Sequence, residues 1–185
     1  MITPRTEKDL WVEMAIREIS TQAHFAEISY KNIDIKADLS TDLVFSSIHS
    51  FLSHSANISK MLKANDADNP SKTIGGILDI SESSKIHNRD FRNHLEHYDE
   101  RLKTWIGEKG VNINIGTYNI GPKSALDLPN TVLVSHYDPY SNIFTFVDED
   151  LDMGELFGEV QRVKSIADKW VEDTMTQKIS PPFMS

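Results

Sequence analysis

Residues able to do acid–base chemistry beside a bound phosphate are concentrated in the middle of the chain. Arg92, Asn93 and His97 lie close together, with Glu96 between them and a second histidine at His94. Histidine titrates near neutral pH and can act as a general base or a general acid, while arginine can neutralise negative charge that develops on a phosphate. We therefore take this cluster as the candidate functional centre.

One amphipathic helix over residues 84–106 is predicted to carry the cluster. Apolar residues repeat every three to four positions along it, and the chemically active residues fall mainly on the opposite arc. At about 100° per residue, Arg92 and His97 diverge by roughly 140°, so they converge only on a bound group or across a symmetric interface. Asn93 and His97 are four residues apart and are expected to touch. His94 lies nearer the apolar margin, where a structural role is expected.

Three other segments, residues 6–33, 40–64 and 152–174, show the same apolar spacing and are predicted to be amphipathic helices. Between the third and fourth helices the helical period is lost. Two β-branched and aromatic runs, at 131–136 and 143–147, flank a turn-forming segment and predict a β-hairpin.

Four helices that each have one apolar face can bury those faces against one another. The expected fold class is therefore mainly α: a four-helix bundle with a β-hairpin insertion between helices three and four. We expect a single domain over residues 1–185, with the insertion at about 111–148 and a frayed tail from about 179. Gly75 and Gly76 are predicted to form a turn that precedes the third helix.

The 185-residue chain carries a formal net charge of −9 and contains no cysteine. A generic nucleic-acid-binding surface is basic, so RNA binding would need a local basic pocket or a partner that supplies positive charge. The absence of cysteine excludes disulfides and cysteine-ligated metal centres. No apolar segment has the length of a signal-peptide core or of a membrane span, so we expect a cytoplasmic protein without membrane association.

The spacing Arg92-Asn93-x-x-x-His97 resembles the motif of the HEPN superfamily. These small helical-bundle domains typically carry an arginine, a polar residue, and a histidine four to six residues after the arginine on one helix. Arg89 and His94 also fit that spacing, so the register stays open. Arg92, Asn93 and His97 are favoured because they clear the apolar face. The resemblance covers the helical bundle and not the insertion.

The resemblance implies a metal-independent endoribonuclease of the toxin or phage-defence type, acting as a homodimer whose paired motifs line one cleft. His97 would be the general base or acid, Arg92 would stabilise the scissile phosphate, and Asn93 would hold the imidazole in one tautomer. The implied partners are an RNA substrate and a cognate antitoxin protein, and no cofactor is implied. The supporting residues would be Arg89, His94 and Glu96.

The same residues are also compatible with other interpretations. A non-catalytic HEPN-like binding or assembly module is the alternative function, and the charged residues could also form only exposed ion pairs, each worth about 0.2–0.5 kcal/mol. A metal enzyme is not favoured, because the cluster lacks the His-Glu-x-x-His and Glu-x-x-His patterns. Residues 116–124 imitate a phosphate-binding loop, but Pro122 interrupts its Gly-Lys step and removes a backbone donor.

Overall fold

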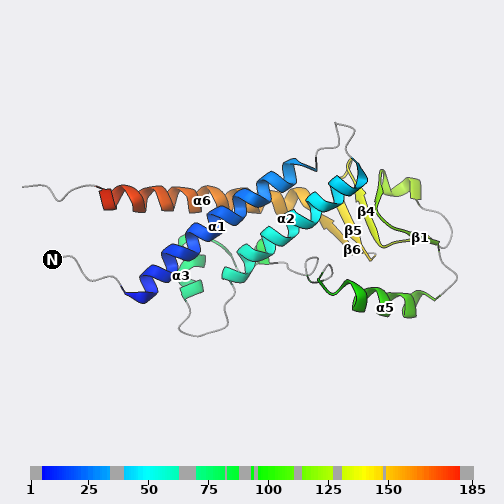
Figure 1. Cartoon of the computed structure of the whole chain (residues 1–185), viewed down its shortest axis with the longest axis horizontal. Helices are drawn as coiled ribbons and strands as arrows, with labels where there is room; N and C mark the ends of the chain where they lie inside the picture. The colour runs from blue at the N-terminus through cyan, green and yellow to red at the C-terminus, as the bar shows by residue number, and fades with distance from the viewer. Residues whose placement is uncertain are drawn as a thin grey trace, which may run out of the picture.

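The computed structural model describes residues 6–33, 40–62, 70–81, 83–87, 93, 96–110, 114–126, 131–147 and 149–179. Long helices form one part of the molecule, and short strands gather at its other end (Figure 1). Within the described residues, no helix combines the length and the apolar content that crossing a membrane requires. The last helix ends at Ile179, and the rest of the predicted frayed tail, residues 180–185, lies outside the described residues.

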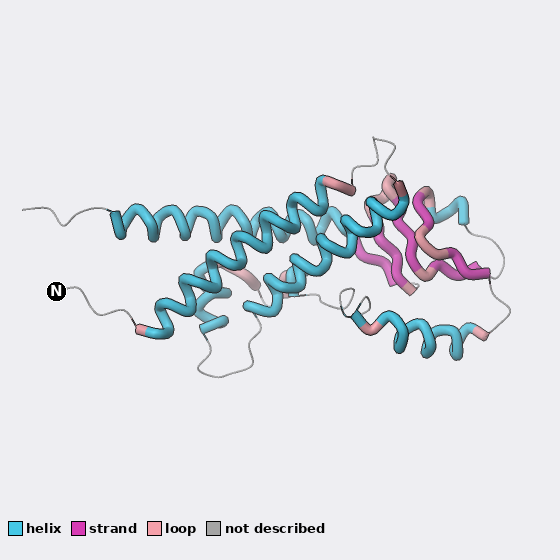
Figure 2. The backbone as a smooth tube through the Cα atoms, viewed as in Figure 1, coloured by secondary structure: helices cyan, strands magenta, loops and turns pink. Residues whose placement is uncertain are grey.

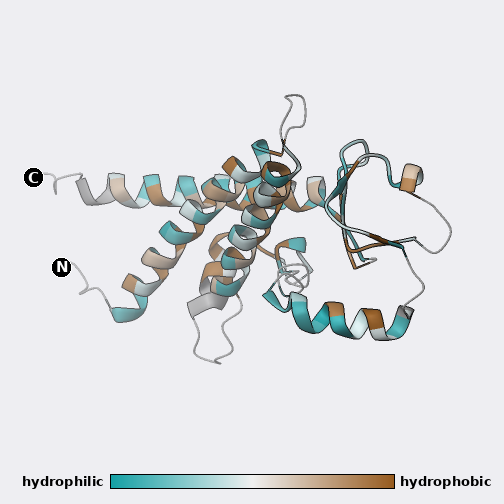
Figure 3. Ribbon diagram, turned by 45° about the vertical axis from the view of Figure 1, so that its right-hand side comes forward, coloured by the Kyte–Doolittle hydropathy of each residue, from teal (hydrophilic) through white to brown (hydrophobic). Residues whose placement is uncertain are grey.

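Three long helices form the main body: α1 (Glu7–Lys31), α2 (Thr41–Leu62) and α6 (Met153–Ile179). Helix α1 packs against both of the others, and hydrophobic ribbon segments gather where the helices cross (Figure 3). The predicted apolar stripes are confirmed, because their central residues are fully buried. These residues include Ile16, Ile19, Ala23, Ile48, Phe51, Val160, Val163 and Ala167.

Side chains at the helix starts explain where these helices begin. Thr6 and Asp9 form a capping box before α1, which satisfies two backbone N–H groups that the helix itself leaves unpaired. The Ser40 hydroxyl accepts a hydrogen bond from the Leu43 N–H at 3.3 Å before α2. Before α6, a carboxylate oxygen of Asp152 accepts from the backbone N–H three residues later at 2.8 Å. All three starts agree with the sequence-based expectation.

A short helix, α3 (Pro70–Ile77), packs against α1 and α2. The predicted turn at Gly75 and Gly76 is wrong, because both residues belong to this helix. The chain turns later, where Asp79 adopts a left-handed conformation with φ of 49°. The Ile80 N–H donates to the Gly75 carbonyl at 2.9 Å, which closes the helix end in the manner of a C-terminal cap. A 3₁₀ turn, η1 (Lys85–His87), follows.

A hairpin lies where one was predicted, formed by the antiparallel pair β4 (Ser135–Asp138) and β5 (Ile143–Phe146). The predicted first strand, 131–136, is wrong in its extent, because residues 131–133 form a separate strand with another partner. The hairpin belongs to a sheet of order β2-β4-β5-β6, completed by β2 (Asn119–Ile120) and β6 (Glu149–Asp152). Figure 2 shows the strands gathered at one end of the molecule. A separate parallel pair joins β1 (Asn114–Gly116) and β3 (Thr131–Leu133). A 3₁₀ turn, η2 (Lys123–Leu126), lies between β2 and β3 in the chain.

Helix α5 (Tyr98–Lys109) lies beside the strands, away from the crossing of the long helices (Figure 1). Its buried Trp105 packs against Val132 and Val134, in a hydrophobic cluster separate from the main core. The Tyr98 ring approaches Phe146 of β5, with 5.7 Å between the ring centroids. The apolar face of this helix is therefore covered by the strand region. The chain is mainly helical with a small β-sheet region.

Candidate functional site

The structure describes half of the predicted cluster. Asn93, Glu96 and His97 lie within the described residues. Arg92 and the two supporting residues Arg89 and His94 lie outside them, so neither motif register is placed in space.

The prediction of one continuous helix over residues 84–106 is wrong at His97. This residue has φ of −110° and ψ of 36°, which is not helical, and it takes the N-cap position of α5. Asn93 and His97 remain one turn apart, because the His97 N–H donates to the Asn93 carbonyl at 2.9 Å. Asp99 and Glu100 lie in the first turn of α5, where carboxylates interact favourably with the positive end of the helix dipole. The acidic pair thus favours a new helix start at this point.

The His97 imidazole is open to solvent, with 60% of its side chain exposed. Its Nδ1 lies 3.8 Å from Oε2 of Glu100, a residue whose side chain is also largely exposed. This separation permits an ion pair when the imidazole is protonated and is too long for a hydrogen bond. The imidazole can therefore reach an external molecule, and a carboxylate stands beside it to stabilise the charged form.

The other described members of the cluster surround His97 without enclosing it. Glu96 is exposed, and Asn93 is half-buried. On α5 itself, Asp99 and Arg101 are exposed as well. The cluster is therefore a surface feature held by the start of α5, and the packing of Trp105 against the strands fixes that helix in place.

A second group of polar residues runs across the four-stranded sheet. Strand pairing places Asn119 opposite His136, His136 opposite Thr145, and Thr145 opposite Asp150, so the four side chains share one face. The Thr145 hydroxyl donates to Asp150 at 2.5 Å. The ammonium of Lys123 contacts both oxygens of Asp150, at 2.8 and 2.9 Å. We call these five residues the polar row.

His136 is the unusual member of the polar row, because it is completely buried. Burial lowers the pKa of His136, and the nearby Asp138 carboxylate opposes this effect in part. The pKa of Asp150 is also below its usual value, because hydrogen bonds from Lys123 and Thr145 outweigh the effect of burial. The row therefore runs from a buried imidazole, whose neutral form is favoured, to an ionised carboxylate at the surface.

Sequence inspection predicted the strands of this hairpin but did not select His136 as a candidate site residue. The missed signal is the alternation along each strand. His136 precedes Tyr137, and Thr145 lies between Phe144 and Phe146; the three aromatic residues belong to the main core. The pairing register that aligns the two polar positions is a long-range property, which the local pattern does not reveal.

Among the described residues, no three His, Asp or Glu side chains gather in an arrangement that could hold a metal ion. No model of a known protein family matches the chain, and no curated protein and no solved structure matches it.

Proposed function

We propose that the protein is a metal-independent endoribonuclease of the HEPN type, built on a mainly helical fold and acting as a homodimer. The observation that carries the proposal is the exposed imidazole of His97 with the Glu100 carboxylate 3.8 Å from it. An imidazole that accepts and releases protons must reach the substrate, and this one lies at the molecular surface.

The proposed cleavage uses the ribose 2′-OH of RNA, which lies beside the phosphate that is cut. His97 as general base takes the proton of a ribose 2′-OH, and the 2′-oxygen attacks the adjacent phosphorus. The bond from phosphorus to the 5′-oxygen breaks, and that oxygen takes a proton from the imidazolium of the second copy. The products are a 2′,3′-cyclic phosphate and a 5′-hydroxyl. Glu100 supports the step by stabilising the imidazolium that forms.

The negative charge of the protein sets a requirement for this reaction. Asp99 and Glu100 lie next to His97, and the whole chain has a formal net charge of −9, so the local field repels phosphate. Positive charge must therefore be supplied at the cleft, and Arg92 of each copy is the proposed source. The proposed reaction therefore requires a homodimer, because only then do two copies of Arg92 face one scissile phosphate.

The test is an RNA cleavage assay with 5′-labelled single-stranded RNA in the presence of EDTA. We expect cleavage by the wild-type protein, and we expect His97→Ala to slow it by a factor of about 10²–10⁴, as loss of a general base does. The matched control is His24→Ala, which removes an exposed histidine of α1. Uncut RNA, or equal rates for His97→Ala and wild type, would show that His97 is not catalytic.

The alternative is a non-catalytic HEPN-like binding or assembly module. The observation that favours it is the same concentration of carboxylates beside His97, because an acidic surface suits a basic protein partner better than RNA. In that case the protein binds its partner through this surface, and RNA remains intact under all conditions of the cleavage assay.

A further inference from the structure

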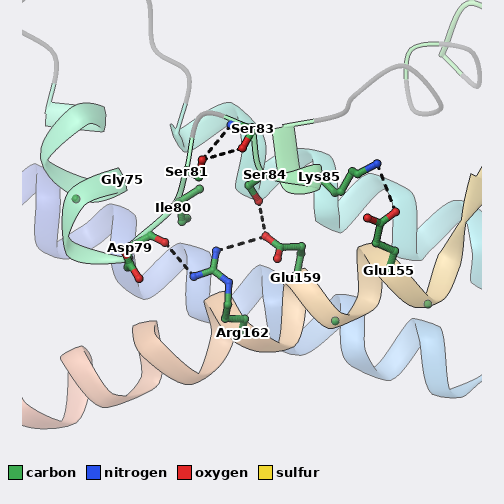
Figure 4. Close-up of a pocket in the computed structure, with 13 residues that line it drawn as sticks. Gly75, Asp79, Ile80, Ser81, Ser83, Ser84, Lys85, Glu155, Glu159 and Arg162 are labelled. Carbon is green, nitrogen blue, oxygen red and sulfur yellow. Dashed lines mark hydrogen bonds and ion pairs between the residues drawn. The ribbon is translucent and has the colours of Figure 1, made fainter.

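A cleft of about 800 Å³ lies between the end of α3 and the first half of α6. Figure 4 shows its lining: the Lys85–Glu155 ion pair at one end, Arg162 with the Asp79 backbone at the other, and Glu159 between them. The cleft lies outside the His97 cluster and draws its residues from α3, η1 and α6.

Glycines leave the cleft open. Gly75 and Gly76 of α3 and Gly158 of α6 line it, and a Cβ built on any of the three would meet nothing within 4 Å. Gly154 differs, because a Cβ there would approach the Asn142 side chain to 2.9 Å. Glycine is the poorest helix former after proline, so three helical glycines without a packing reason call for another explanation. They keep side chains out of the space above the helix backbones.

Carboxylates dominate the charge of the cleft. Lys85 and Arg162 supply two positive charges, and Asp79, Glu155 and Glu159 supply three negative ones, which leaves a net charge of −1. The formal charge of the whole chain, −9, has the same sign. A cationic occupant is therefore favoured over an anionic one.

The central carboxylate is held in place and ionised. The Ser84 hydroxyl donates to Oε2 of Glu159, and Arg162 lies 3.3 Å from the same oxygen. These contacts keep the pKa of Glu159 below its usual value. Lys85 likewise contacts Oε2 of Glu155, at 3.4 Å. Among the contacts of the described residues, none involves Oε1 of Glu155 or Oε1 of Glu159. The two glutamates are one helical turn apart on α6, so their side chains lie on the same side of the helix.

We propose that this cleft binds an arginine-bearing peptide segment of a partner protein. The guanidinium has five donors in a planar fork, which suits the two open carboxylate oxygens of Glu155 and Glu159 better than a compact ammonium does. The glycine floor receives the peptide backbone, and the serine hydroxyls at the rim supply further hydrogen-bonding groups. This binding goes beyond the proposed nuclease activity and does not depend on it.

The probe is the capped pentapeptide glycine-arginine-glycine-arginine-glycine, titrated into the full-length protein at low salt, with Kd measured by calorimetry. We expect Glu159→Gln to raise Kd at least tenfold, and Gly158→Leu to do the same by filling the floor. Two matched controls are on α5: Glu108→Gln removes an exposed carboxylate, and Gly107→Leu fills another open helical glycine. Both should leave Kd within twofold of wild type.

Several results would overturn the proposal. One is an equal loss of peptide binding in Glu108→Gln and Glu159→Gln. Another is a Kd that changes in neither Glu159→Gln nor Gly158→Leu. A third is that a peptide with glutamate in place of arginine binds with the same affinity as the arginine peptide. Equal affinity for arginine amide alone would also overturn it, because the peptide backbone would then contribute nothing. If Glu159→Gln lowers the melting temperature, Glu155→Gln decides, since its side chain is 53% exposed and its loss leaves the Ser84 contact intact.

Discussion

Two histidines show how the surroundings of a residue decide what it can do. His97 is exposed at the start of α5, where its imidazole is open to solvent. His136 is fully buried in the polar row, where the charged imidazolium is disfavoured. The first is suited to act on an external molecule. The second affects the pH dependence of folding instead.

Three histidines that are partly or fully buried should make the protein sensitive to mild acid. Burial lowers the pKa values of His49, His54 and His136 in the folded protein. As the pH falls below about 6.5, the unfolded chain therefore binds protons that the folded chain does not, and the free energy of unfolding decreases. We expect chemical denaturation to show this loss between about pH 7 and pH 5, above the range in which most carboxylates titrate.

Replacement of His136 by glutamine separates the contribution of His136 to the pH dependence of stability from those of His49 and His54. His136→Gln should reduce the loss of stability between the two pH values, whatever its effect at neutral pH, because glutamine does not titrate. His24→Gln removes the imidazole of an exposed histidine and serves as the control. An unchanged pH dependence in His136→Gln would mean that His136 is not the group that resists protonation.

At the scale of elements, periodicity predicts a helix more reliably than it predicts what covers the helix. The spacing of buried residues identified α1, α2 and α6, whose apolar stripes run for several turns. The same spacing in α5 gave no sign that Trp105 packs against Val132 and Val134. Strands as short as β1 and β2 are below the length at which alternation is measurable.

The exposure of His97 was predictable from the sequence, but the shape of the backbone at this residue was not. Residue types and spacing identified His97 as exposed and polar, and the structure agrees. The non-helical backbone at His97 was missed, because residues 84–106 show a continuous apolar repeat. The cleft lined by Gly158 and Glu159 was missed for another reason: its two walls come from segments far apart in the chain, and local patterns carry no information about such contacts.

The packing of Trp105 should determine whether α5 stays in position. Trp105→Ala removes the buried centre of the second hydrophobic cluster, and truncation of a buried tryptophan costs about 3–5 kcal/mol. We expect this loss to increase hydrogen exchange in α5 and the β3 region much more than in α1. Thr104→Ala is the control, because Thr104 is exposed on the same helix and its hydroxyl bonds only to the Glu100 carbonyl among the contacts described. Uniform exchange in both variants would show that α5 is held by other contacts.

The negative charge of the whole molecule opposes formation of the dimer that the proposed two-chain cleft requires. Each copy adds a formal charge of −9, so association of two copies must overcome long-range repulsion that salt screens. We expect sedimentation to give twice the chain mass of 21.0 kDa. Because salt screens the repulsion between the two copies, the dimer should dissociate less at about 0.3 M salt than at about 0.05 M salt. A strict monomer would exclude paired motifs in one cleft.

Mixing experiments then test whether the two copies share one reaction. If each cleavage needs His97 from both copies, only dimers of two wild-type chains are active, and re-equilibrated activity falls with the square of the wild-type fraction. One part wild type with three parts His97→Ala should retain about one sixteenth of the activity, against about one quarter if each chain acts alone. A linear decrease would assign the reaction to single chains, and the general acid would then have to come from within the same copy.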